Sequence, residues 1–106
     1  MAEEPSRTDR IMRHMPADRR VIAQTIRTCA VWEFASRWPE AADDMAAVVC
    51  GRWLHSALGT DDPAVASATP NVDRLVNECY ATLDDKQIAA TEHMFRELSG
   101  LWRDLR

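Results

Sequence analysis

The sequence predicts an all-α fold, a small bundle of four to five helices with long first and last helices. Apolar side chains recur at steps of three and four along most of the chain, as on one face of a helix. Residues that start or end helices, such as Pro16, Gly59 and Asp84, separate these stretches. A chain of 106 residues suits one domain with one core. We therefore expect a single helical domain over 16–106, preceded by an N-terminal arm, 1–15.

The arm is polar and contains several arginines. Ser6 and Asp9 have the spacing of a helix N-cap and its partner, so this segment can hold a short helix. Its apolar side would consist of Ile11, Met12 and Met15. Pro16 then either breaks the chain or begins the next helix.

The first long helix should run from about Ala17 to Trp38, with two apolar faces. One face carries Ile22, Ile26, Cys29 and Trp32, and the other carries Val31, Phe34 and Trp38 beside Arg27. We expect Trp32, like Trp53 further along the chain, to lie in the core. The second face can be covered either by other helices of the same chain or by a partner.

The next two helices are less evenly marked. One is expected over 40–58, where Gly51 would be explained by close backbone packing. Residues 59–69 have the composition of a loop, and Thr69 and Pro70 suit the N-cap and first position of the following helix. That helix carries the most regular core stripe, formed by Val72, Leu75, Val76, Cys79, Tyr80 and Leu83.

The last helix should begin at Asp84, with Gln87 as its capping-box partner, and continue almost to Arg106. Its apolar residues follow a heptad-like seam that Thr91 interrupts. The seam consists of Ile88, Thr91, Phe95, Leu98, Trp102 and Leu105.

The net charge of −4 is unevenly distributed. Residues 1–37 carry seven arginines against five acidic residues, whereas residues 38–91 carry three basic residues against nine acidic ones. The expected acidic surface consists of Asp43, Asp44, Asp61 and Asp62. Most of this surface would repel a phosphate backbone, so nucleic-acid binding is disfavoured outside the Arg-containing N-terminal third. Arginine supplies twelve of the thirteen basic residues and alanine is abundant, a bias typical of GC-rich bacterial or phage genomes.

The location is expected to be cytoplasmic. The N-terminus lacks the basic start and apolar run of a signal peptide, and no apolar run is long enough to span a membrane. The three cysteines are odd in number and widely spaced, which is not a disulfide framework.

No pattern of an enzyme, metal site or cofactor site is found. Cys29, Cys50 and Cys79 lack the close pairs of metal ligands, so we expect them to pack in the core. His93 and Glu97 are four residues apart, but the paired Glu-x-x-His motifs of di-iron bundles are absent. Neither a phosphate loop nor a nucleophile elbow occurs.

The remaining hypothesis is a non-enzymatic protein-interaction module, expected to form a homodimer. Aromatic side chains with arginine on a poorly covered face are typical of interface centres. The predicted contact surface consists of Arg27, Phe34, Trp38, Leu101 and Trp102. The module would serve as an adaptor, a regulator or a small inhibitor of a larger protein. The alternatives are a regulator that binds DNA through the N-terminal third and a regulator that binds a small ligand between helices.

Overall fold

The structure, a computed structural model, describes residues 6–56 and 62–104, and the side chains of residues 6–55 and 62–100. Within these residues it contains five helices and no strand, which confirms the predicted all-α bundle. The helices are α1 (Arg7–His14), α2 (Ala17–Ala35), α3 (Ala42–Ser56), α4 (Pro63–Tyr80) and α5 (Asp85–Asp104). As predicted, the first long helix and the last helix, α2 and α5, are the longest, with 19 and 20 residues.

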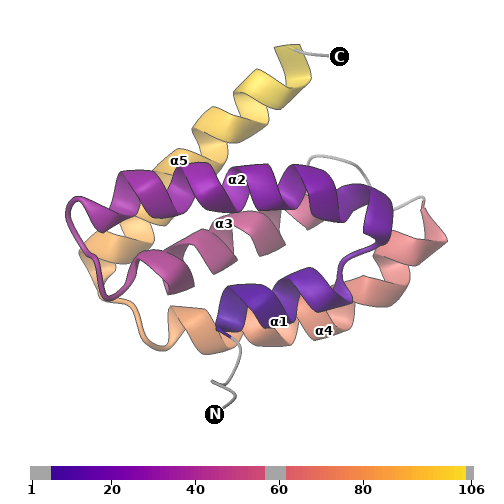
Figure 1. The fold of residues 1–106 in the computed structure, drawn as a ribbon, viewed down its shortest axis with the longest axis horizontal. Helices are drawn as coiled ribbons and strands as arrows, with labels where there is room; N and C mark the ends of the chain where they lie inside the picture. Colours follow the sequence, from indigo (N-terminus) through magenta and orange to yellow (C-terminus); the bar gives the residue numbers. More distant parts are fainter. Residues whose placement is uncertain (1–5, 57–61, 105–106) are drawn as a thin grey trace.

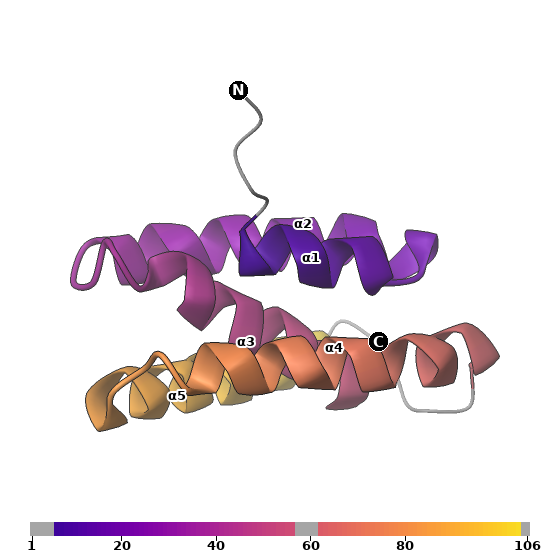
Figure 2. The ribbon, with the colours of Figure 1, turned by 90° about the horizontal axis from the view of Figure 1, so that it is seen from below.

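The helices form two layers joined by α3. α1 and α2 make up one layer and α4 and α5 the other, while α3 runs diagonally from the first layer into the second (Figure 1; Figure 2). α3 packs against each of the other four helices. It is therefore the central helix of the bundle.

The sequence of α3 suits this central position. All six side chains of the run Met45–Cys50 are fully buried, and so is Leu54. Trp53, expected in the core, is only 1% exposed. A helix that is apolar on all sides is stable only where other helices surround it. The core of the molecule is accordingly centred on α3.

The N-terminal segment contributes to this core. Ser6 and Asp9 form the predicted capping box at the start of α1. The segment buries three apolar side chains, those of Ile11, Met12 and Met15. At the other end of α1, the Arg20 guanidinium donates hydrogen bonds to the carbonyl oxygens of Met12 (3.0 Å) and Met15 (3.1 Å). The Met12 carbonyl also accepts the backbone N–H of Met15 at 3.2 Å, so Arg20 adds a side-chain contact to the backbone cap of α1.

The prediction of a loop up to Thr69 is wrong, because α4 begins at Pro63. The Asp62 carboxylate caps α4 by accepting a hydrogen bond from the backbone nitrogen of Ala64 at 2.9 Å. Residues 59–61 lie outside the described part of the chain. An Asp–Pro pair at the N-cap and first helical position matches the favoured start of a helix.

Pro70 therefore lies inside α4 rather than at its start. The Thr69 hydroxyl does not cap the helix but donates to the carbonyl oxygen of Val65 one turn earlier, at 2.8 Å. The early start also buries Val65 and Ala68, which extend the predicted core stripe toward the N-terminus of α4. This additional burial explains why the helix continues through a proline.

The core face of α2 differs from the prediction. The buried side chains are Ala23, Ile26, Ala30 and Phe34. Trp32 is 83% exposed, and Cys29 is exposed as well. Fully buried alanines let α2 approach α3 closely, and a tryptophan on that face would hold the two helices apart. The small side chains, and not the large ones, mark the buried side of this helix.

α5 begins with the predicted capping box. The backbone nitrogen of Asp84 donates to the Gln87 side chain at 3.0 Å, and that of Gln87 donates to the Asp84 carboxylate at 2.9 Å. Thr91, which interrupts the apolar seam, is fully buried, and its hydroxyl donates to the carbonyl oxygen of Ile88 at 2.7 Å. Phe95 and Leu98 are only half-buried. The C-terminal half of α5 projects past α2 (Figure 1).

Candidate functional site

The surface between α2 and α5 contains a groove of about 780 Å³. Its floor is apolar and consists of Phe34, Trp38, Ala90, Met94 and Leu98. Its polar rim is exposed and includes Cys29, Glu33, Arg37, Lys86, His93 and Glu97. We call this feature the α2–α5 groove.

The groove exists because α2 and α5 pack on α3 from opposite layers. Phe34 belongs to the buried core, while Trp38, Met94 and Leu98 pack against that core and remain partly exposed. A contiguous apolar surface of this kind, with a polar rim, is typical of a site that binds another molecule.

The rim has two ordered polar contacts. The Arg37 guanidinium lies over the Trp38 ring, 4.2 Å from its centroid, and this cation–π contact holds both side chains at one end of the groove. On α5, Nε2 of His93 lies 3.0 Å from Oε1 of Glu97, one helical turn away. Each of these contacts joins residues of the same wall of the groove, either neighbours in the chain or residues one helical turn apart.

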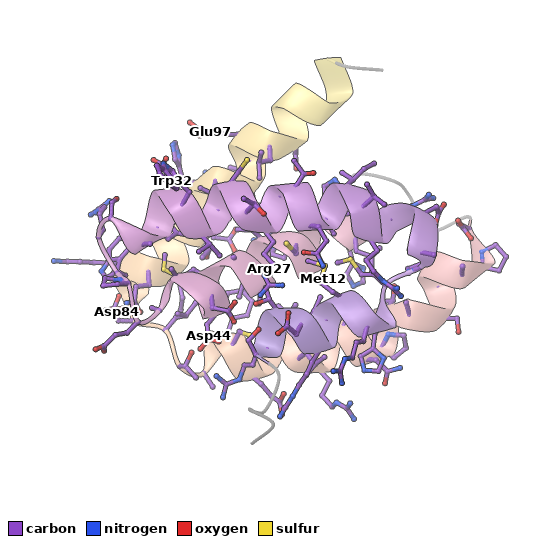
Figure 3. The ribbon with its side chains drawn as sticks, in the orientation of Figure 1. Met12, Arg27, Trp32, Asp44, Asp84 and Glu97 are labelled. Carbon is purple, nitrogen blue, oxygen red and sulfur yellow. The ribbon has the colours of Figure 1, made fainter. Side chains whose placement is uncertain are left out.

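Trp32 lies beside the groove. It is three residues after Cys29 and four before Ser36, both of which line the groove, so the three share one side of α2. Figure 3 shows Trp32 and Glu97 projecting from the same edge of the molecule, away from the space between α2 and α1 that holds Arg27. The prediction that Trp32 lies in the core is therefore wrong. The signal that was overlooked is the alanine stripe on the opposite side of α2.

The structure places two of the predicted contact residues, Phe34 and Trp38, in the groove and a third, Arg27, elsewhere. Phe34 and Trp38 meet in the floor of the groove. Arg27 points from α2 toward α1 (Figure 3), and its Nη1 donates to the Asp9 carboxylate at 2.7 Å. This hydrogen bond holds the pKa of Asp9 below its ordinary value. The side chains of Leu101 and Trp102 lie outside the described residues.

The predicted acidic residues at the start of α3 bind other parts of the chain. Asp43 accepts a hydrogen bond from the Thr8 hydroxyl, and one of its oxygens lies 3.6 Å from Nη2 of Arg27. Asp44 accepts hydrogen bonds from Arg7 at 3.0 Å and from the Thr82 hydroxyl at 2.9 Å. Both carboxylates are half-buried, so they tie α1, α2 and the α4–α5 connection to α3.

The remaining acidic pair is only partly described. Asp62 caps α4 and also accepts a hydrogen bond from Nη2 of Arg19 at 3.2 Å. Asp61 lies outside the described residues. Three of the N-terminal arginines, Arg7, Arg19 and Arg27, are thus paired with acidic residues of the same chain. Phosphate groups of DNA would have to compete with these ion pairs.

The cysteines differ in environment. The prediction of a core position is confirmed for Cys50 and Cys79 and is wrong for Cys29. The thiol of Cys50 donates to the carbonyl oxygen of Ala23, with the sulfur 3.5 Å away. Burial raises the pKa of both Cys50 and Cys79 to about 12, so these two thiols remain protonated. Among the described side chains, no group of three or more His, Cys, Asp or Glu residues is arranged to hold a metal ion.

A further charged cluster links α3, α4 and α5. Glu92 accepts hydrogen bonds from Arg52 and, at 3.1 Å, from the Tyr80 hydroxyl. The Arg52 guanidinium also lies over the Phe95 ring, 4.3 Å from its centroid. The hydrogen bond from Arg52 lowers the pKa of Glu92, although partial burial opposes this shift. The sequence does not reveal this cluster, because its members belong to three helices and no local spacing connects them.

Comparison with known proteins gives no relative. No helix within the described part of the chain has the length and apolar character needed to cross a bilayer. No protein-family model matches the sequence, and no curated protein and no solved structure matches it either.

Proposed function

We propose that this chain is a non-enzymatic protein-interaction module that forms a homodimer through the α2–α5 groove. One observation carries the proposal, namely that an almost fully exposed tryptophan, Trp32, lies beside a groove with an apolar floor. Tryptophan is enriched among the residues that dominate binding energy at interfaces. A surface with an aromatic side chain beside an apolar groove can also bind a second copy of itself, because each copy supplies both the side chain and the groove.

The energetics are compatible with a dimer. Burying a large apolar side chain contributes about 1.5–3 kcal/mol, and a two-fold dimer buries every contact twice. Trp32 would gain most, because it is 83% exposed, and Trp38, Met94 and Leu98 would add their exposed parts. Association also has to offset the loss of translational and rotational freedom. A moderate affinity, in the micromolar range, is therefore the expectation.

The proposal moves the contact surface away from the N-terminal third. Phe34 and Trp38 remain in it, whereas Arg27 is engaged with Asp9. Leu101 and Trp102 stay part of the prediction from sequence. An inhibitor that presents carboxylates in place of phosphates has less support, because Asp43 and Asp44 are committed to contacts within the chain. An adaptor or regulator that acts as a dimer is the role we favour.

The test is size-exclusion chromatography with light scattering on three proteins. We expect a dimer for the wild-type chain and a monomer for Trp32→Ala. Val21→Ala is the matched control, because Val21 is the other large, exposed apolar residue of α2 and lies about three helical turns before Trp32, further from the part of α2 that lines the groove. It should remain a dimer. A wild-type chain that is monomeric at high micromolar concentration would remove the self-association proposal.

A second candidate, a regulator that binds a small ligand, is favoured by the composition of the same groove. Its volume is within the range of about 300–1,000 Å³ that ligand pockets occupy. Trp38, Met94 and Cys29, the residue types expected for such a pocket, are among its lining residues. A thermal-shift screen of small molecules on the wild-type chain and on Trp38→Ala separates the two candidates. A stabilising compound that has no effect on Trp38→Ala and leaves the oligomeric state unchanged would favour the ligand-binding role.

A further inference from the structure

The charges on the rim of the α2–α5 groove are segregated by sign. Arg37, just after α2, and Lys86, in the first turn of α5, make up its basic end. Glu97 makes up its acidic end on α5, and on α2 the acidic Glu33 lies one helical turn, about 6 Å, before Arg37. Lys86 and Glu97 are separated by about 16 Å along α5, at 1.5 Å per residue. The groove therefore has an electrical polarity along its length.

The chain path explains this polarity. The C-terminal end of α2 and the N-terminal end of α5 lie at the same end of the molecule (Figure 1; Figure 2). Arg37 and Lys86 both belong to that end, while Glu33 and Glu97 lie further from it, on α2 and on α5 respectively. All four side chains are exposed, so they are available to a molecule that covers the groove.

We propose that two copies of this chain associate in antiparallel orientation about a two-fold axis perpendicular to the groove. In this dimer Arg37 and Lys86 of one copy face Glu33 and Glu97 of the other, and each Trp32 lies against the apolar floor of the opposite groove. The proposal rests on the self-association proposed above and adds its geometry. A parallel alignment would bring like charges together, which is strongly unfavourable at an interface.

The antiparallel orientation makes a prediction for charge reversal. Arg37→Glu/Lys86→Glu leaves both ends of the groove acidic, so it should raise the dissociation constant of the dimer about tenfold or more. The matched control is Arg13→Glu/Arg74→Glu, which changes the net charge equally at exposed positions outside the groove. The control should retain the wild-type dissociation constant. Circular dichroism and thermal unfolding confirm that each variant is folded.

A fourfold variant tests the orientation itself. Arg37→Glu/Lys86→Glu combined with Glu33→Lys/Glu97→Lys reverses the polarity of the groove. In an antiparallel dimer the reversed charges again face opposite charges, so this variant should form a homodimer with itself. It should not form mixed dimers with the wild-type chain, because each of its ends would meet a like charge. Mixing of two differently labelled proteins, followed by native mass spectrometry, measures this directly.

The outcomes separate the two proposals. A monomeric wild-type chain overturns both. A wild-type dimer that Trp32→Ala dissociates, but that is insensitive to charge reversal or mixes freely with the fourfold variant, overturns the antiparallel orientation alone. A fourfold variant that pairs with itself and excludes the wild-type chain supports the orientation.

Discussion

At Gly51 the backbone of α3 lies directly against α4. A Cβ atom at this position would come within 2.2 Å of Cγ2 of Val76 and 3.3 Å of Cγ1 of Val72. Crowding of this kind in a packed core costs about 1–3 kcal/mol, whereas replacing a helical glycine with alanine gains at most about 1 kcal/mol. We therefore expect Gly51→Ala to lower the free energy of unfolding by about 1–2 kcal/mol in urea denaturation.

Gly100 is the matched control for this substitution. It lies in α5, and an added Cβ atom would meet no heavy atom within 4 Å. Gly100→Ala should therefore raise the free energy of unfolding by about 0.5–1 kcal/mol through helix propensity alone. In a Val76→Ala background, Gly51→Ala should lose most of its destabilising effect. Equal stabilisation by both glycine substitutions would show that α3 and α4 are not this close.

Single residues also show what the sequence could predict. The burial of Trp53, Cys50 and Cys79 follows from their place on apolar stripes, and the structure confirms it. Trp32 and Cys29 lie on an equally regular stripe but are exposed, because α2 turns a different side toward α3. Helical spacing defines the faces of a helix, while the closeness of its neighbour decides which face is buried.

At the scale of the helices, α4 is unusual because a proline, Pro70, lies in its interior. A proline inside a helix removes one backbone hydrogen bond and costs about 3 kcal/mol relative to alanine. Pro70 and Ala66, one turn earlier, are both exposed, so water can satisfy the carbonyl that lacks its partner. We expect Pro70→Ala to raise the free energy of unfolding by about 1–3 kcal/mol.

Pro63 provides the comparison for Pro70, because it occupies the first position of the same helix. At that position the missing N–H would have no intrahelical partner and the fixed backbone angle favours the helix. Pro63→Ala should therefore leave stability unchanged or lower it slightly. Urea denaturation of both variants measures the difference. An unchanged stability for Pro70→Ala would mean that α4 starts at Pro70, as the sequence first indicated.

Helix ends were predictable where the signal is local. Both capping boxes, Ser6 with Asp9 and Asp84 with Gln87, form as their three-residue spacing predicts. The start of α4 was not predictable in this way, because Asp62 with Pro63 and Thr69 with Pro70 offer the same local signal seven residues apart. The core decides between them, since only the earlier start buries Val65 and Ala68.

For the molecule as a whole, the central helix is the feature that sequence could not identify. Both α2 and α3 carry apolar residues on more than one side, and two apolar faces were predicted from the sequence for α2. In the structure α3 is enclosed and α2 lies at the surface. The groove follows from this arrangement, because it combines Phe34 and Trp38 of the α2 end with Met94 and Leu98 of α5. The first two were predicted as contact residues, but their pairing with α5 depends on tertiary packing.

The Arg52–Glu92–Tyr80 cluster couples three helices and makes stability depend on pH. Hydrogen bonding to Arg52 holds the pKa of Glu92 in the folded state below its ordinary value of 4.5. Its contribution to the free energy of unfolding is therefore fully present above about pH 4.5 and is lost as the pH falls through the lower, folded value. Glu92→Gln should lower stability at neutral pH and make the decline in stability below pH 4.5 shallower than in the wild-type chain.

Urea denaturation across this pH range, at one fixed protein concentration, measures the effect, because the stability of a dimer depends on concentration. Glu40→Gln removes an exposed carboxyl outside the cluster and should retain the wild-type slope. Asp9, whose pKa is also held low by Arg27, keeps part of the acid sensitivity in Glu92→Gln. If Glu92→Gln and Glu40→Gln decline with the same slope as the wild-type chain, the contact between Arg52 and Glu92 does not stabilise the packing of α5 on α3. The packing of α5 on α3 would then depend on apolar contacts and on the cation–π contact between Arg52 and Phe95.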